Sequence, residues 1–446
     1  MYYRKIQDDL KIWKIKKDRK PLIIRGARQV GKTTVVNLFA EEFDNFIPLN
    51  LELFEDREIF KKEYSIDEII SAIQILKGKN ISSGKTLIFI DEIQNSAIAV
   101  KMLRYFYEKR PDLFIIAAGS LLEIFLERDE ISFPVGRIEF LYMYPFNFYE
   151  FLDAKNEKQI LNLILKGNVP DFIHHTLMKY FLNFSMIGGM PEIIQTFLET
   201  SDINSLKSIY ESLFVSYTTD AEKYARNQTM KQILRHCLSS ICQETGKRIK
   251  FQNFGNSNYR SREVGEALKT IEKAMLINLV YPVINSDLPL VFDYKRAPKL
   301  HFLDIGLINY FAGIQSEYIK QEDLNSVFKG IAAEQIVRQE LIASDYTTNF
   351  VPPIWTREKK YSNAEVDLVL QIDNLVIPIE VKSGATGSLR SLHQFLDESK
   401  IDFAVRIYSD KMKIEDAKTP EGKKYRLLNV PHYLTGNLRK LIKQYI

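Results

Sequence analysis

Short apolar runs alternate with amphipathic stretches over the first 120 residues. Apolar runs that end at glycine or acidic residues are typical of buried parallel strands, and apolar residues three and four positions apart predict helices. The predicted strands span 21–25, 46–51, 86–90 and 113–118. The predicted helices span 1–20, 33–43, 67–76 and 103–108. This alternation predicts a three-layer α/β domain that ends near an aromatic cluster at 142–151.

The pattern changes twice further along the chain. From about 155 to 300 helical spacing dominates, and two helices lead into two apolar strands, which outlines a winged helix. These four elements are predicted at 230–243, 261–278, 279–284 and 289–294. Beyond 300 the expected elements are a helix at 328–344, strands at 365–372 and 375–382, a helix at 388–396 and a strand at 402–408. We therefore predict an α/β domain over 1–152, a helical and winged-helix-like region over 153–299, and a second α/β domain over 300–446.

Composition adds little to this division. The 446 residues are 46% hydrophobic, and the formal net charge is +4, which neither requires nor excludes nucleic acid. Cys237 and Cys242 lie five residues apart, on different faces of a helix, so neither a disulfide nor a metal pair is expected. Few cysteines and a charged N-terminus predict a cytoplasmic protein, and the lack of any apolar run of about 18 residues predicts no membrane span.

The most specific motif lies between the first predicted strand and the following helix. Residues 26–33 match a P-loop at every fixed position: Gly26, Ala27, Arg28, Gln29, Val30, Gly31, Lys32 and Thr33. The two glycines let backbone N–H groups turn inward around phosphate oxygens. Lys32 can reach the β and γ oxygens of ATP, and the Thr33 hydroxyl can hold Mg²⁺. A chance glycine turn is the alternative.

A second motif supports the first. The apolar run 87–90 ends at Asp91 and Glu92, which places both acids at the carboxyl end of a parallel strand, where open α/β sheets bind ligands. We expect Asp91 to hold Mg²⁺ and Glu92 to act as the general base that activates water. Ser120, at the end of the next strand, contacts the γ-phosphate or the water, or is a simple turn residue.

Two arginines have open roles. Arg137 precedes a further apolar run and is a candidate arginine finger that acts on a neighbouring subunit, which would require at least a transient homo-oligomer. A surface salt bridge explains Arg137 equally well. Arg28 lies inside the P-loop and contacts phosphate or faces solvent.

Together these residues resemble the AAA ATPases, and more narrowly the bacterial and archaeal group with a C-terminal domain of unknown function. The resemblance rests on residues 26–34, 89–94, 119–120, 135–137, 145–152, 188–192 and 302–307. It implies an AAA module with Thr34 in its nucleotide site, a winged-helix-like linker, and a C-terminal domain with a restriction-endonuclease-like core. Leu121 stands where the family pattern has a further serine, which weakens Ser120 as a sensor.

Acidic residues of the C-terminal domain suggest a second site. By strand alternation Asp367 lies on the polar face of its strand, and Glu380 and Lys382 share the polar face of the next. This is the D…ExK pattern of restriction-like nucleases, and Glu334 on the preceding helix matches the additional acid of that fold. Clustered carboxylates can bind Mg²⁺ or Mn²⁺, which would activate water for phosphodiester cleavage with Lys382 orienting it.

The same residues have a simpler explanation. Any amphipathic hairpin carries acids and lysines on its wet face, and Pro378 fits an edge strand better than a central one. Cleavage would also require a basic groove, for which the candidates are Lys295, Arg296, Lys299, Arg357, Lys359, Lys360 and Arg390.

Two functions therefore remain open. In the first, ATP hydrolysis controls a nucleic-acid-acting C-terminal domain, a metal-dependent nuclease on DNA or RNA. In the second, the protein is a nucleotide-switched module that binds a protein partner and has an inactive nuclease-like domain. A basic side chain in the metal position would exclude cleavage.

Overall fold

A computed structural model describes residues 2–61, 63–81, 84–120, 136–167, 169–315, 330–359 and 362–446. The chain forms two compact units. The N-terminal unit comprises Met1–Tyr144 with two short later segments, Lys273–Leu276 and Asp345–Asn349. The C-terminal unit comprises the rest of the chain, so the predicted segments 153–299 and 300–446 lie mostly within it.

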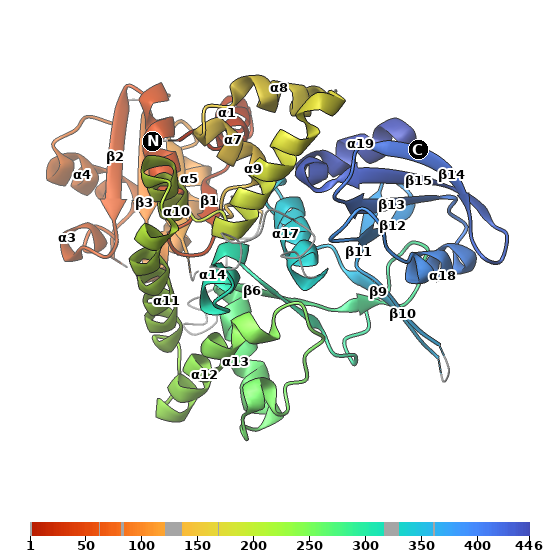
Figure 1. Cartoon of the computed structure of the whole chain (residues 1–446). Coiled ribbons are helices and arrows are strands. Elements are labelled where there is room, and N and C mark those ends of the chain that lie inside the picture. Colours follow the sequence, from red (N-terminus) through yellow and green to blue (C-terminus); the bar gives the residue numbers. More distant parts are fainter. Residues whose placement is uncertain are drawn as a thin grey trace. The chain divides into compact units, whose positions relative to one another are not determined.

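The N-terminal unit is built on a five-stranded parallel sheet in the order β2-β3-β4-β1-β5 (Figure 1). Its strands are β1 (Leu22–Arg25), β2 (Asn45–Asn50), β3 (Thr86–Asp91), β4 (Phe114–Gly119) and β5 (Glu139–Tyr142). Its helices are α1 (Ile6–Ile15), α2 (Lys32–Phe39), α3 (Phe54–Arg57), α4 (Ile66–Lys77) and α5 (Ala97–Lys109). The four strands predicted from apolar runs are confirmed to within about one residue at each end, and β5 was not predicted.

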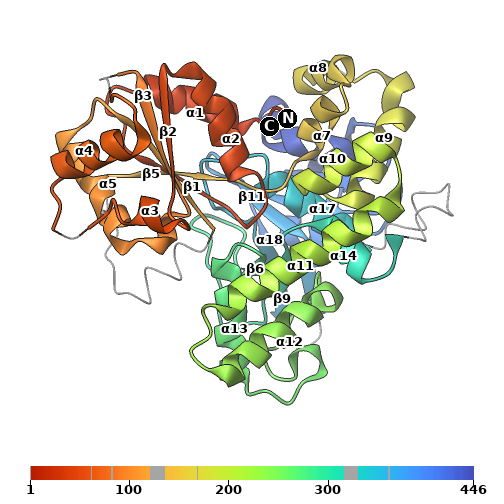
Figure 2. The ribbon, with the colours of Figure 1, turned by 90° about the vertical axis from the view of Figure 1, so that its left-hand side faces the viewer.

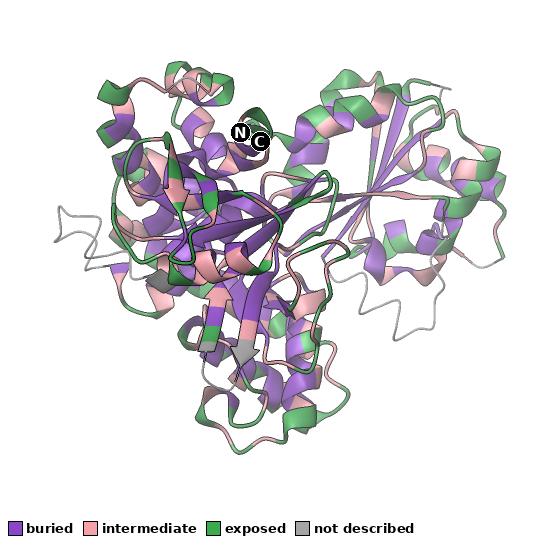
Figure 3. Ribbon diagram, turned by 90° about the vertical axis from the view of Figure 1, so that its right-hand side faces the viewer, coloured by how far each residue is buried: buried purple, intermediate pink, exposed green. Residues whose placement is uncertain are grey.

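Helices cover both faces of this sheet (Figure 2). The apolar faces of α4 and α5 pack on one side, where side chains from β1 to β4 form a continuous core. On the other side Trp13 of α1 contacts the rings of Phe39 and Phe114, with ring centroids 6.5 and 6.0 Å away. The predicted three-layer α/β arrangement is confirmed. The central strands β1, β3 and β4 are buried along most of their length, whereas β2 and β5 at the edges are partly exposed (Figure 3).

The C-terminal unit begins with helices. They are α7 (Phe148–Ala154), α8 (Lys158–Lys166), α9 (His174–Ile187), α10 (Pro191–Thr200), α11 (Lys207–Glu222), α12 (Gln228–Glu244) and α13 (Ser261–Lys273). Three short strands follow, β6 (Ile277–Val280), β7 (Pro282–Val283) and β8 (Lys299–Phe302), and then α14 (Ile305–Phe311).

One element predicted in this region is wrong. Residues 289–294 do not form a strand. Their one β-bridge is isolated and pairs Phe292 with Val283 of β7. Their apolar side chains are not buried, with Val291 46% and Phe292 37% exposed, so no sheet face required a full strand. The antiparallel partner of β6 is β8, and Arg248 bridges to Lys299 on the other side of β8.

The rest of the C-terminal unit is α/β. It contains α17 (Gly330–Ile342), β9 (Ile354–Lys359), β10 (Ser362–Val366), β11 (Leu368–Ile372), β12 (Leu375–Val381), α18 (Arg390–Glu398), β13 (Phe403–Tyr408), β14 (Lys413–Lys418), β15 (Lys424–Pro431) and α19 (Leu438–Tyr445). A mixed five-stranded sheet has the order β11-β12-β13-β15-β14, and a second sheet has the order β10-β9-β7. Among the described residues, no helix is both long enough and apolar enough to cross a membrane.

Two details of this sheet differ from the sequence prediction. The strand predicted at 365–372 is broken at Asp367 into β10 and β11, which belong to different sheets. Pro378, expected to favour an edge, lies in β12 between β11 and β13. The ladder between β12 and β13 begins only at Ile379, so the missing N–H of Pro378 falls outside it.

Candidate functional site

The predicted P-loop joins the inner strand β1 to α2. Gly26 is needed there because a Cβ atom at this position would lie 2.3 Å from the carbonyl oxygen of Met143. Gln29 and Gly31 have φ values of 64° and 99°, so the loop turns twice through the left-handed region before α2 begins. A loop that turns in this way directly before the N-terminus of a helix is an arrangement that suits phosphate.

Lys32 is the first residue of α2 and is buried. Its ammonium group donates hydrogen bonds to the carbonyl oxygens of Gly26 at 3.0 Å and Ala27 at 2.8 Å. The cation is therefore held inside the loop, where phosphate oxygens would neutralise it.

Thr33 of α2 contacts Asp91 at the carboxyl end of β3. The Thr33 hydroxyl donates to Asp91 Oδ2 at 2.7 Å, although the residues are 58 positions apart. Two neighbouring ligands of an octahedral Mg²⁺ lie about 3 Å apart, because each metal–oxygen bond is about 2.0–2.1 Å. The two predicted magnesium ligands therefore have a spacing that fits the ion. Burial raises the pKa of Asp91, and the Thr33 hydrogen bond partly offsets that rise.

Glu92 is held by a residue to which we assigned no role. It has a left-handed φ of 51°, and its Oε2 accepts a hydrogen bond from the side-chain amide of Gln94. Gln94 is buried, and a Cβ atom on Gly119 would lie 2.5 Å from its Oε1, so glycine at the end of β4 makes room for this amide. Gln94 is a positioning residue for Glu92. In the sequence, the position of Gln94 two residues after the predicted base could have indicated this contact.

The remaining nucleotide-site residues lie around this centre. Ser120 follows β4 and is buried, and β4 lies between β1 and β3 in the sheet. Thr34 is an exposed residue of α2. Arg28 is half-buried, with a guanidinium nitrogen 4.0 Å from Glu52 Oε1. Leu121 lies outside the described residues. These placements leave the predicted contacts of Ser120, Thr34 and Arg28 with phosphate as predictions.

Arg137 forms a surface ion pair. Its Nε lies 3.0 Å from Glu108 Oε1, and Arg104 Nε contacts the same oxygen at 2.9 Å. Hydrogen bonds from these two arginines, with Arg137 first, lower the pKa of Glu108. The Arg137 side chain is 44% exposed, so it remains accessible to another subunit. Its role as an arginine finger stays a prediction.

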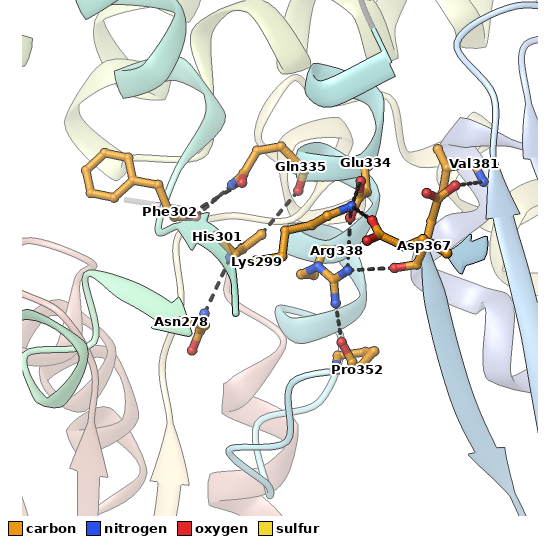
Figure 4. Close-up of polar contacts among 11 residues, drawn as sticks. Asn278, Lys299, His301, Phe302, Glu334, Gln335, Arg338, Pro352, Asp367 and Val381 are labelled. Atoms are coloured by element: carbon orange, nitrogen blue, oxygen red, sulfur yellow. Dashed lines mark hydrogen bonds and ion pairs between the residues drawn. The ribbon is translucent and has the colours of Figure 1, made fainter. Parts of the chain in front are cut away.

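In the C-terminal unit the four predicted site residues, Glu334, Asp367, Glu380 and Lys382, approach one another. A second lysine, Lys299, lies among them. Lys299 of β8 points toward Glu334 of α17 and the segment that carries Asp367 (Figure 4). Its ammonium nitrogen lies 2.7 Å from Glu334 Oε2 and 2.6 Å from Glu365 Oε1. Burial lowers the pKa of Lys299, but the carboxylates of Glu334, Glu365 and Asp367 together raise it above its usual value. Lys299 was expected to line an open groove, and this prediction is wrong because the side chain is buried.

Two further cations neutralise the same acids. Arg338, one helical turn after Glu334, donates to Glu334 Oε1 at 3.1 Å and to the Asp367 carbonyl at 2.7 Å. Lys382 Nζ lies 2.6 Å from Glu380 Oε1. We call Glu334, Glu365, Asp367 and Glu380, together with Lys299, Arg338 and Lys382, the acid cluster.

The protonation of this cluster reflects its burial. Burial first, and then the charges of Glu334 and Glu380, raise the pKa of Asp367 well above its usual range, while its Oδ2 accepts from the Val381 amide at 2.8 Å. Burial also raises the pKa of Glu380, partly offset by Lys382. In the part of the chain that the structure describes, no three acidic, histidine or cysteine side chains are arranged to hold a metal ion.

Comparison with protein families identifies the N-terminal domain. Residues 18–152 match the family model of an AAA domain. Two further models, described as domains of unknown function (DUF8612 and DUF4143), match residues 178–318 and 329–426. The N-terminal unit therefore contains an AAA domain, and this domain supports ATP as its ligand. No curated protein gives a significant match to the sequence.

Comparison with solved structures gives weak similarities. A Walker-type ATPase, paby2304 of Pyrococcus abyssi, is 16% identical, covers 70% of this chain and 96% of its own, and has a TM-score of 0.46. The ORC2 protein of Aeropyrum pernix is 13% identical over 72% of this chain and 96% of its own, with a TM-score of 0.29. PCH-2 of C. elegans is 13% identical, covers 44% of this chain and 62% of its own, and has a TM-score of 0.28. All three TM-scores lie below 0.5, and these similarities add nothing to the AAA assignment.

Proposed function

We propose that the chain is a magnesium-dependent ATPase whose nucleotide state controls a C-terminal binding domain that cuts nothing. The observation that supports hydrolysis is the contact of Thr33 with Asp91 beside the P-loop, with Glu92 next in sequence and held by Gln94. In this proposal Lys32 and the loop amides bind the phosphates, Thr33 and Asp91 hold Mg²⁺, and Glu92 takes the proton of the attacking water.

The position of Lys299 supports a binding domain over a nuclease. An ammonium group that contacts two carboxylates occupies the place where a divalent ion would have to bind. It supplies the positive charge that clustered carboxylates otherwise take from a metal. We propose that the restriction-endonuclease-like core is retained as a scaffold, and that the acid cluster joins β8, α17 and the β10–β12 segment within the C-terminal unit. In this proposal the wild-type acid cluster holds Lys299 and binds no Mn²⁺.

Loss of the Thr33 hydroxyl is expected to weaken Mg²⁺ binding and so to raise the Mg²⁺ concentration that hydrolysis requires. In Thr33→Val, the Mg²⁺ concentration for half-maximal phosphate release should rise at least about tenfold, because one oxygen ligand is lost. Thr33→Ser keeps the hydroxyl and should stay near wild type. Phosphate release measured against Mg²⁺ concentration tests the proposed function, and a wild-type protein without Mg²⁺-dependent release would refute it.

Replacement of Lys299 by methionine is expected to destabilise the protein by about 3–5 kcal/mol, because it removes the buried cation that contacts both Glu334 and Glu365. The measurement is chemical denaturation with and without Mn²⁺. Millimolar Mn²⁺ should recover part of the loss in Lys299→Met and leave the wild type unchanged.

The matched control is Lys413→Met, which removes a lysine paired with Glu415 at the surface. Exposed pairs contribute little, so this variant should lose less than about 1 kcal/mol. If Mn²⁺ stabilises the wild type and Asp367→Ala abolishes that effect, the cluster binds metal and the nuclease hypothesis returns.

A further inference from the structure

Positive charge is concentrated in residues 226–297. This segment includes the helices α12 and α13, which Figure 1 labels. Residues 226–297 contain twelve lysines and arginines against six acids, a net charge of +6, whereas the whole chain has +4. The remainder of the chain is therefore net negative, and a polyanion approaching the molecule would be attracted to this region.

The helix α13 is neutral, with three basic and three acidic residues, but two of its cations lie on its solvent-facing side. Val264, Leu268 and Ile271 are buried and fix the inner face of the helix. Arg262 and Lys269, seven residues apart, are exposed on the opposite face. Glu266 lies between them in the sequence, and its Oε2 is paired with Arg226 Nη2 at 3.1 Å. Arg226 therefore balances the charge of this acid, and Arg262 and Lys269 keep theirs.

Two more cations flank the helix. Arg260 is exposed directly before the first turn, where the helix dipole adds further positive potential. Lys250 is exposed. The next residue, Phe251, packs against α13, because a Cβ atom on Gly265 would lie 3.0 Å from its ring. In the described residues no carboxylate pairs with Lys250, Arg260, Arg262 or Lys269, which we call the α13 cations.

We propose that the exposed face of α13 binds duplex DNA, with the α13 cations contacting phosphates. A helix of 13 residues is about 20 Å long and fits the major groove of B-form DNA, which is about 12 Å wide. The deep, narrow major groove of A-form RNA does not admit a helix. Unpaired cations and a neutralised acid on one helix face match a phosphate backbone, whose contacts position a protein on the duplex. This inference does not depend on ATP hydrolysis.

The test is binding of a fluorescein-labelled 30-base-pair DNA to the full-length protein between 50 and 250 mM NaCl. Each phosphate contact contributes about −0.9 to the slope of log affinity against log salt, so four contacts predict a slope of about −3 to −4. Arg262→Ala/Lys269→Ala should reduce the slope by about 2 and weaken binding at least tenfold. Its ATP hydrolysis should be unchanged.

Lys418→Ala/Lys424→Ala is the matched control, because it removes two exposed lysines from the same unit and causes the same loss of net charge. It should bind DNA like the wild type. The proposal is overturned by an equal effect of the control, by an absence of DNA binding at 50 mM salt, or by equal binding of an RNA duplex of the same sequence. If DNA binding follows the prediction but the wild type hydrolyses no ATP, the proposed ATPase function fails and this inference stands.

Discussion

Glu92→Gln is expected to bind ATP normally and to hydrolyse it about 10²–10⁴-fold more slowly than the wild type, the usual contribution of a general base. The glutamine amide keeps the size of the side chain and its position beside Gln94 but cannot accept a proton from water. The left-handed backbone at residue 92 already fixes the direction of the side chain, so the change should affect chemistry more than structure. Equilibrium binding of a fluorescent ATP analogue and single-turnover phosphate release would separate the two effects.

Two further variants serve as controls for this experiment. Lys32→Ala should lose nucleotide binding as well as turnover, because the ammonium group lies within the P-loop. Glu58→Gln neutralises an exposed acid of the same unit that pairs with Lys61, and it should be indistinguishable from the wild type. Turnover in Glu92→Gln equal to that of Glu58→Gln would remove Glu92 from its proposed role.

The N-terminal unit was predictable because its central strands β1, β3 and β4 are buried on both faces. A strand such as β3 is then a continuous apolar run, and its carboxyl end falls at the first acid, Asp91. β5 escaped prediction because it has only four residues, and three of them are half-buried. The first helix was predicted over 1–20, but α1 ends at Ile15, where Lys16 turns to extended backbone. The lysine-rich sequence of residues 14–20 contains no glycine or proline that would mark the end of the helix.

The C-terminal site was predictable only in part. Strand alternation correctly brought Asp367 near the β12 segment, since Asp367 Oδ2 accepts from the Val381 amide. It could not show that the chain changes sheets at Asp367, because that break depends on how β9 and β12 compete for the neighbouring strands. Lys299 comes from β8 and is 35 residues from Glu334, so only tertiary structure brings its charge into the cluster. The same lysine could not be distinguished in the sequence from those at the surface.

The second large effect is expected at Arg137. If this residue is an arginine finger, Arg137→Ala should lower the ATPase rate by about 10³–10⁵-fold at protein concentrations that favour assembly. The arginine would exchange Glu108 for the phosphate charge of a neighbouring subunit, and its exposure permits that exchange. Steady-state phosphate release over a range of protein concentrations measures the effect, and the wild-type rate per subunit should rise with concentration.

Arg104→Ala is the matched control, because Arg104 pairs with the same oxygen of Glu108 as Arg137. A purely structural ion pair at the surface predicts similar, small effects for both variants, whereas a finger predicts a large effect for Arg137→Ala alone. A mixture of Arg137→Ala and Lys32→Ala proteins should recover part of the activity, since one subunit then supplies the arginine and the other the intact P-loop. A monomeric protein with full ATPase activity, or a mixture without recovery, would leave Arg137 as a partner of Glu108 and nothing more.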